Sequence, residues 1–428
     1  MKQIFGFMLA LMLAAHSSAA NDIIFETNAQ FEASQKARAE GLAAFRAGNH
    51  TVALVKMEEA LSHRPGNTLI LGYTAYLAAE TGDLTRAQEA ANLYAAAGQA
   101  PGGGIQRKLT EKLDAGIWAD LKEKFDTNIA PKGDALVHAT VSADVKLVEG
   151  ITVAPDGRTF VSSVVSGGIY SVNGNGNTLL VSASTHKMGS FFGIAFDTSH
   201  NSLFAAYARV EQTPDTVAGE GTTGVAEFDA ATGVLLHNWV LNGSTDEHQI
   251  ADLLITHDHS VYASDATGRA VYRIDDTKLM KAFDLPASMS PQGLAELDGE
   301  LYLADYGRGI WHLNTATGAA TLLGRQAETN LVGFDGLTAR GGRLIAIQNG
   351  SNPHKIVALT LSADRKSVTK LTVLAQSLPG FDEPTLGVST ASGYYFVAGS
   401  QWPKFGKGGE LKDDATIKPT TVLILPLP

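Results

Sequence analysis

Six residues recur at the start of similar strand-like segments in the second part of the chain. Each precedes a small or aliphatic triplet, a turn and a strand with an aromatic or aliphatic residue, as in EGITVAPDGRTFVSS and DGLTARGGRLIAIQN. The first residues of the copies are Glu149, Phe192, Asp252, Gln292, Asp335 and Thr385. Four of these side chains carry carboxylate or amide oxygens, and three are acids. If the copies are equivalent in space, these oxygens converge on one site.

Three converging carboxylates repel one another, so they need protons, a basic partner or a bound cation. No lysine or arginine stands at the same position of the repeat. A divalent ion held by Glu149, Gln292 and Asp335 is the economical solution. Calcium is the first choice because every donor is an oxygen, with manganese, magnesium and zinc as alternatives. The other interpretation is that these residues cap strands without any metal.

The elements that must position these side chains follow from the repeat itself. The copies are about 40 to 60 residues apart, the length of a four-stranded propeller blade. Further strands such as GIYSVN and GIWHLN follow most copies. The pattern predicts a mainly β fold, a six-bladed β-propeller over residues 135–428. The innermost strands line a central channel, which brings the first residues of the copies to one mouth.

The two ends of this region predict how the ring closes. ALVHATVSA, residues 135–143, precedes the first copy, and TTVLILPLP, residues 420–428, follows the last. We expect residues 135–143 to pair as the outer strand of the last blade. Such a pairing hides two open sheet edges.

Residues 30 to about 125 have helical spacing and are rich in alanine, leucine and glutamate. At an offset of 34 residues, three pairs coincide, namely Gly48/Gly82, Asn49/Asp83 and Ala53/Ala87. This segment resembles tetratricopeptide repeats, whose period is the same; an ordinary pair of helical hairpins is the alternative. We expect a helical domain over residues 21–130. One more helix over residues 105–125 would cap the stack, or the stack would dock on the rest of the protein.

The first twenty residues are typical of an export signal. Lys2 precedes an apolar run over residues 4–15 and a stretch of small residues, Ser17 to Ala20. We expect residues 1–20 to be removed, the protein to be periplasmic or secreted, and no transmembrane anchor to remain. The chain of 428 residues has no cysteine, which excludes disulfides and thiol chemistry, and its net charge of −11 argues against a nucleic-acid partner.

Residues 140–428 resemble the propellers of the gluconolactonase, senescence-marker-protein and luciferin-regenerating-enzyme group. The likeness lies in EGITV with Glu149, PQGLA with Gln292 and FDGLT with Asp335, which the resemblance implies hold a catalytic metal. Asp252, after Ala251, matches a position that contacts substrate or water. This chain departs from the family where glutamine replaces asparagine at position 292 and alanine precedes Asp252. These departures put sugar-lactone specificity in doubt.

If the family activity persists, the small-molecule substrate is a lactone or related ester. The ion would polarise its carbonyl, and Asp335, or Asp252 through a water, would be the general base. Asn349, His354 and Trp402 are expected to shape the rim of the substrate site.

The alternative function is a non-catalytic scaffold. DATGRAVYRID and DYGRGIWHLN also resemble NHL-type propeller repeats, which often bind partners. In these segments we expect Arg269 to pair with Asp265 and Arg308 with Asp305, as structural contacts. A protein or peptide partner would then bind through the helical repeats.

Overall fold

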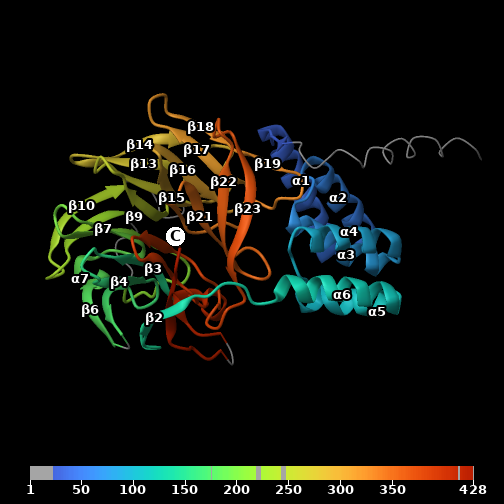
Figure 1. The fold of residues 1–428 in the computed structure, drawn as a ribbon, viewed down its shortest axis with the longest axis horizontal. Coiled ribbons are helices and arrows are strands. Elements are labelled where there is room, and N and C mark those ends of the chain that lie inside the picture. The colour runs from blue at the N-terminus through green and yellow to red at the C-terminus, as the bar shows by residue number, and fades with distance from the viewer. Residues whose placement is uncertain (1–22, 175, 218–222, 242–246, 413–414, 428) are drawn as a thin grey trace, which may run out of the picture.

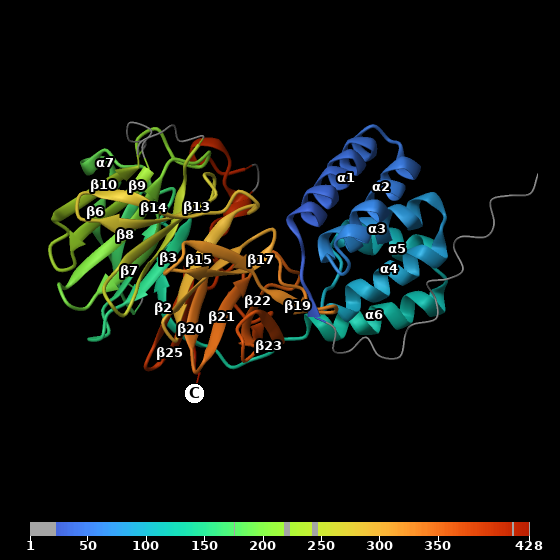
Figure 2. The same cartoon turned by 90° about the horizontal axis from the view of Figure 1, so that it is seen from above.

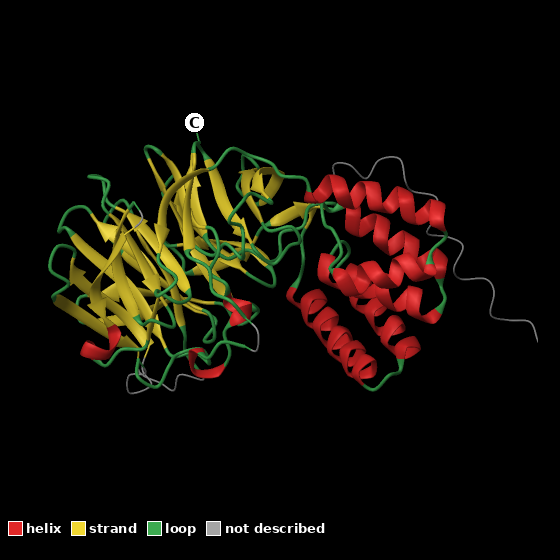
Figure 3. Ribbon diagram, turned by 90° about the horizontal axis from the view of Figure 1, so that it is seen from below, coloured by secondary structure: helices red, strands yellow, loops and turns green. Residues whose placement is uncertain are grey.

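The structure is a computed structural model that describes residues 23–174, 176–217, 223–241, 247–412 and 415–427. The predicted export signal, residues 1–20, lies outside the described residues. Six helices form one block beside a mainly β part, on the side of β19 and β23 (Figures 1 and 2). Figure 3 shows the same division, with the long helices gathered in one part and the strands in the other. Within the described residues, no helix has the length and apolarity needed to cross a membrane.

The helical block consists of three pairs of consecutive helices, and a short turn connects the two helices of each pair. The helices are α1 (Asn28–Arg46), α2 (His50–His63), α3 (Thr68–Thr81), α4 (Leu84–Ala96), α5 (Gly103–Lys112) and α6 (Ala115–Ile129). The residues that repeat in the sequence make equivalent turns. Gly48 and Gly82 have φ values of +75° and +86°, a conformation that glycine adopts readily. Asn49 and Asp83 then cap α2 and α4, accepting from the backbone N–H three residues later.

Small side chains let these helices approach closely. Ala53 and Ala87, at equivalent positions of α2 and α4, are both fully buried. The expectation of one capping helix over residues 105–125 is wrong, because two helices, α5 and α6, occupy this segment. The chain extends at Leu113 (φ −81°, ψ 152°), and the Asp114 side chain accepts from the Gly116 N–H at 2.8 Å to begin α6.

The mainly β part contains six sheets, and each of the six sequence copies supplies the first two strands of one sheet. The first three sheets contain β3 (Val148–Val153), β4 (Thr159–Ser163), β5 (Gly168–Asn173) and β6 (Gly176–Ser182); β7 (Ser190–Asp197), β8 (Ser202–Ala208), β9 (Thr223–Asp229) and β10 (Leu235–Leu241); β11 (Ile250–Ile255), β12 (Val261–Asp265), β13 (Ala270–Asp275) and β14 (Lys278–Asp284). A short helix, α7 (Ala183–His186), connects the first two of these sheets.

The other three sheets follow the same order, with additions at two edges. They contain β15 (Pro291–Leu297), β16 (Glu300–Asp305), β17 (Gly309–Asn314) and β18 (Ala319–Leu322); β20 (Leu337–Arg340), β21 (Arg343–Gln348), β22 (Lys355–Leu361) and β23 (Ser367–Gln376), extended by β19 (Gly324–Gln326) and β1 (Ile23–Ile24); β24 (Gly387–Thr390), β25 (Gly393–Val397), β26 (Thr420–Leu425) and β2 (Leu136–Val141). Two single 3₁₀ turns, η2 (Trp402–Lys404) and η3 (Lys407–Gly409), lie between β25 and β26.

The first strands of neighbouring sheets touch one another all the way round. β3 contacts β7, β7 contacts β11, β11 contacts β15, β15 contacts β20, β20 contacts β24, and β24 returns to β3. Separate apolar clusters fill the spaces between neighbouring sheets; one joins Phe160, Ile169, Phe191 and Ile194. This is a propeller-like arrangement in which the first strands surround a common axis. Residues far apart in the sequence therefore meet at that axis.

The predicted closure of the ring is confirmed. β2 pairs antiparallel with β26, with Leu136 opposite Ile424 and Val141 opposite Thr420. The sheet thus contains three strands from the end of the β region and one from its beginning. The pairing covers the free edge of β26 and ties the two ends of the ring together by backbone hydrogen bonds.

Candidate functional site

The recurring first residues lie at the start of the innermost strands, and the glycines after them explain the close approach of these strands. A Cβ on Gly336 would lie 2.7 Å from the carbonyl oxygen of Thr385, and one on Gly293 would lie 2.7 Å from that of Asp335. The N–H of each glycine instead donates to that same carbonyl oxygen, at 3.1 and 3.0 Å. The glycine after the recurring residue therefore lets the recurring residue of the next sheet approach within hydrogen-bonding distance of the backbone.

Glu149 is buried in β3, with 7% of its surface exposed. The indole N–H of Trp402 donates to its carboxylate, with Nε1 2.7 Å from Oε2. Its backbone oxygen accepts from the hydroxyl of Thr385 at 2.8 Å, which joins the first sheet to the last. Trp402, expected on the substrate rim, is thus in direct contact with an expected metal ligand.

Asp335 is held by an amide side chain. Nδ2 of Asn349 donates to Oδ2 of Asp335 at 2.7 Å and to the carbonyl oxygen of Pro384 at 3.0 Å. With both amide hydrogens used, Oδ1 of Asn349 remains buried and accepts no hydrogen bond from the described residues. The imidazole of His354 donates from Nδ1 to the backbone oxygen of Asn349 at 2.7 Å. Asn349 and His354 therefore support Asp335, which sequence reasoning had not foreseen.

The side chain of Gln292 makes its hydrogen bond to a residue outside the group of acids. Its Nε2 donates to the hydroxyl of Ser290 at 2.8 Å, two residues earlier in the chain. Thr385 donates its hydroxyl to the backbone of Glu149, and the carbonyl oxygen of Phe192 accepts from the hydroxyl of Ser162. Of the six recurring positions, Glu149, Asp252 and Asp335 thus bring ionisable groups to the axis.

Asp252 differs from Glu149 and Asp335 in that it also lines a cavity. The backbone N–H groups of Leu253 and Leu294 lie near enough to its carboxylate to lower its pKa. This cavity has a volume of about 620 Å³ and runs along the innermost strands. The cavity is lined mainly by apolar side chains, and neither Glu149 nor Asp335 borders it. Asp252 therefore faces this cavity from the side of the acids.

Glu383 is a fourth acid that the sequence analysis missed. It lies two residues before Thr385, in FDEPTLG, and its φ of +66° is unusual for a residue with a side chain. The backbone N–H of Trp402 lies near enough to its carboxylate to lower its pKa, while Oε2 is buried without a donor among the described residues. The available signal was the acidic pair Asp382-Glu383 directly before the sixth copy.

Burial raises the pKa of all four acids, and the charges of the other acids raise the pKa of Glu149 and Asp335 further. Burial, and then the charge of Asp335, raise the pKa of Glu149 well above its usual range, while the bond from Trp402 lowers it. Burial raises the pKa of Asp252 and of Asp335 to about 7 each, and the charge of Asp252 adds to the effect on Asp335. Burial and then Asp382 raise the pKa of Glu383 to about 7. No lysine or arginine of the described residues contributes to these pKa values.

Two further groups lie in the field of this acidic cluster, which consists of Glu149, Asp252, Asp335 and Glu383. Tyr306 has 40% of its surface exposed, and burial followed by the charges of Asp335 and Glu383 raises the pKa of its hydroxyl. Burial lowers the pKa of His354, so this imidazole is neutral at physiological pH. Tyr306 had not been singled out from the sequence, because its position in a loop after β16 carries no repeat signal.

The acids are close enough to interact electrostatically, yet they are not arranged as a finished metal centre. Among the described residues, no group of three or more histidine, aspartate and glutamate side chains is placed to hold a metal ion. The possible ligand atoms nearby are all oxygens, and two of them, Oδ1 of Asn349 and Oε2 of Glu383, accept no hydrogen bond from the described residues. This chemistry suits a hard cation rather than a soft one.

The comparisons with known proteins found likenesses in structure but none in sequence. A scan of protein-family models and a search of curated proteins found no match. Among solved structures, a PQQ-bound aldose sugar dehydrogenase from Streptomyces coelicolor is similar at 14% identity and a TM-score of 0.48, covering 69% of this chain and 99% of that one. Regucalcin from Agrobacterium tumefaciens, described as calcium-binding, has 14% identity and a TM-score of 0.45 over 68% of this chain and 94% of that one. A luciferin-regenerating enzyme has 10% identity and a TM-score of 0.44 over the same shares. At this level the likeness says nothing about activity.

Proposed function

We propose that this chain is an exported hydrolase, dependent on a divalent metal ion, that opens a lactone or a related ester. In this proposal the six sheets are the blades of a six-bladed β-propeller, and the helices are a tetratricopeptide-like module. The observation that carries the proposal is the acidic cluster. Four carboxylates share one end of the channel without a basic partner among the described residues, which favours a site built for a cation.

The proposed ligands extend the set expected from the sequence. Glu149 and Asp335 are its fixed members, because Trp402 and Asn349 already orient their carboxylates. Oδ1 of Asn349 and the carboxylate of Glu383 offer the unused oxygens, and Gln292 joins only if its side chain turns away from Ser290. Calcium fits this all-oxygen set best, with manganese, magnesium and zinc as alternatives.

The chain's own groups would carry the proton transfers. The metal, when bound, supplies Lewis-acid polarisation of the substrate carbonyl. In the metal-free protein the pKa values of Asp335 and Asp252 are about 7. Asp252, which is not among the proposed ligands, would accept a proton from water at neutral pH, and Asp335, whose pKa a bound cation would lower, is the alternative base. Tyr306, His354 and Trp402 would line the mouth where an uncharged lactone enters.

The experiment compares the metal-free protein with Glu149→Gln and Asp335→Asn. We expect calcium or manganese to raise the melting temperature of the wild type, and a panel of lactones and aryl esters to contain a substrate. Each variant should lose the metal response and the turnover. Asp298→Asn, at a surface residue paired with Arg365, is the matched control and should keep both. A wild type without metal stabilisation and without turnover on the panel would contradict the proposal.

A second function, binding of a protein or peptide partner by a non-catalytic scaffold, is favoured by one feature of the helical module. A cavity of about 790 Å³ lies between α4 and α6, lined by Leu93, Asp120 and Glu123 among others, and Leu93 has 52% of its surface exposed. An open surface of this kind has no part in hydrolysis of a small molecule. A metal response without turnover, combined with peptide binding that Leu93→Glu removes, would favour this function over the first.

A further inference from the structure

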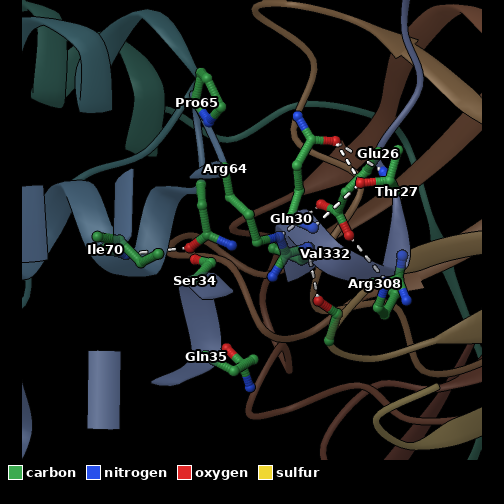
Figure 4. Close-up of polar contacts among 12 residues, drawn as sticks. Glu26, Thr27, Gln30, Ser34, Gln35, Arg64, Pro65, Ile70, Arg308 and Val332 are labelled. Atoms are coloured by element: carbon green, nitrogen blue, oxygen red, sulfur yellow. Dashed lines mark hydrogen bonds and ion pairs between the residues drawn. The ribbon is translucent and has the colours of Figure 1, made fainter. Parts of the chain in front are cut away.

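Three arginines meet where the helical block joins the mainly β part. Arg64 follows α2, Arg308 connects β16 to β17, and Arg325 lies in β19. Arg64 and Arg308 have only 6% and 4% of their surface exposed. Figure 4 shows Arg64 and Arg308 turned toward Glu26, which precedes α1. The expectation that Arg308 pairs with Asp305 is wrong for the side chain, because its guanidinium points across the junction instead.

One carboxylate serves two of these cations. Nε of Arg64 lies 2.6 Å from Oε2 of Glu26, and Nε of Arg308 lies 2.9 Å from Oε1. The ring of Phe31 is in contact with both guanidinium groups, with centroid distances of 5.1 Å to Arg64 and 4.3 Å to Arg308. The two cations are thus held close together in a water-poor environment, where their mutual repulsion is strong.

Backbone oxygens take up most of the remaining guanidinium hydrogens. Arg308 donates from Nη1 to Ala287 at 2.7 Å and to the Asn28 side chain at 3.1 Å. Arg64 donates from Nη2 to Gly307 at 3.0 Å. Arg325 donates from Nη1 to Ala327 at 2.9 Å, among other carbonyls. These bonds satisfy hydrogens but add no negative charge.

At this junction, three buried donors make no hydrogen bond with the described residues. They are Nε of Arg308, which lies beside Glu26 only as an ion pair, Nη2 of Arg308 and Nδ2 of Asn330. The N–H of Val332 donates to Oδ1 of Asn330 at 3.3 Å, which fixes the amide so that Nδ2 points the other way. Arg308 and Asn330, together with Arg64 and Arg325, line one small cavity of about 10 Å³. This is close to the volume needed for a single water-sized sphere.

The charges around this cavity do not balance. Arg64, Arg308 and Arg325 contribute three positive charges, while Glu26 and the buried Asp305 contribute two negative ones. Asp305 is near enough to act on Arg308, although its oxygens accept from N–H groups such as those of Gly307 and Trp311. Burial lowers the pKa of Arg308 and of Arg325, but guanidinium groups stay protonated in proteins. One positive charge therefore remains among three guanidinium groups, of which Arg64 and Arg308 are buried and Arg325 is half-buried.

We propose that this cavity is a binding site for a monatomic anion, chloride under ordinary conditions. The ion would accept from Nη2 of Arg308 and Nδ2 of Asn330 and would offset the remaining charge beside Arg64. Phosphate, sulfate and carboxylate ligands are too large for a cavity of about 10 Å³. A water molecule has the right size but leaves the charge unbalanced.

The proposed ion would strengthen the junction between the two parts of the molecule. Its two donors, on Arg308 and Asn330, come from the β side, and the positive charge of Arg64, which lines the same cavity, comes from the helical side. Because a ligand that binds only the assembled junction stabilises it by mass action, junction stability should follow the halide concentration.

The experiment measures melting of the full chain in sodium chloride, sodium bromide and sodium gluconate at equal ionic strength. We expect a higher melting temperature in either halide than in gluconate, rising with the logarithm of halide concentration. Crystals soaked in bromide should show an anomalous peak between Arg308 and Asn330. Equal melting in all three salts, with no such peak, would mean that the cavity holds only water and would overturn the proposal.

Two variants separate a bound anion from a general salt effect. Asn330→Asp keeps the acceptor for Val332 and places a carboxylate oxygen where the amide N–H₂ points, so it should remove the halide response and match the wild type in chloride. Arg365→Lys, at the surface pair with Asp298, should respond to halide as the wild type does. A halide response that persists unchanged in Asn330→Asp would refute this site.

Discussion

The charge of Asp335 should destabilise the metal-free protein at alkaline pH, so that Asp335→Asn stabilises it. In the folded protein the pKa of Asp335 is about 7, against an ordinary 3.8. A carboxyl group whose pKa rises on folding binds its proton more tightly in the folded state. Its unfavourable contribution is therefore absent below about pH 4, develops as the pH rises to about 7, and is complete above that.

The size of this effect follows from the two pKa values. A tenfold change in proton affinity corresponds to about 1.4 kcal/mol, so the difference between about 7 and 3.8 gives at most roughly 4 kcal/mol. Because Asp335 is partly exposed, solvent screening reduces this, and about half, roughly 2 kcal/mol, is the expected effect. Asparagine removes the charge and keeps an oxygen that accepts from Nδ2 of Asn349.

The assay is thermal unfolding in the presence of a chelator, followed by circular dichroism at pH 5 and pH 8. At pH 8 we expect Asp335→Asn to melt about 4–8 °C above the wild type, as about 2 kcal/mol implies for a domain of this size. At pH 5 the gain should fall to about 40% of its value at pH 8, because pH 5 lies between the unfolded and folded pKa values. Asp298→Asn, at the surface, should stay within roughly 0.5 kcal/mol of the wild type at both pH values. A variant that is equally destabilised at both pH values would refute the reasoning.

Two further predictions concern the same site. Trp402→Phe removes the N–H that favours the ionised form of Glu149, so it should raise the pKa of Glu149 further. When Glu149 is ionised, the free energy of unfolding should fall by about 1.5–3 kcal/mol, measured as a loss of stability that grows with pH. Trp239→Phe, which removes a bond to a neutral backbone oxygen, should lose about 1 kcal/mol at every pH; the same pH dependence in both would contradict this explanation. Gly336→Ala places a methyl group 2.7 Å from a backbone oxygen and should lower stability by about 1–3 kcal/mol, whereas Gly104→Ala in α5, where the new methyl group meets nothing within 4 Å, should be neutral or slightly stabilising. Equal melting temperatures for the two alanine variants would show that the innermost strands can move apart freely.

Local sequence patterns were sufficient to predict the helices, the strands and the strand pairing that closes the ring. The repeated glycine and capping residue at Gly48-Asn49 and Gly82-Asp83 specify the turns of the helical block, because both effects act within a few residues. The copies that begin at Glu149 and Asp335 likewise specify a strand, a turn and a second strand. The single helix expected over residues 105–125 failed because Leu113-Asp114 contains neither glycine nor proline, and only the cap at Asp114 divides the segment.

The sequence by itself determined that acids recur at the start of the innermost strands. Side chains that alternate between the two faces of a strand, combined with a turn that repeats at regular spacing, are compatible with few other folds. Tertiary structure alone decided which side chains meet there. Gln292 turned to Ser290, Glu383 joined the acids, and Arg308 crossed to Glu26, since each of these choices depends on charges and oxygens brought close from distant parts of the chain. Such long-range electrostatic and steric contacts have no signature in local spacing.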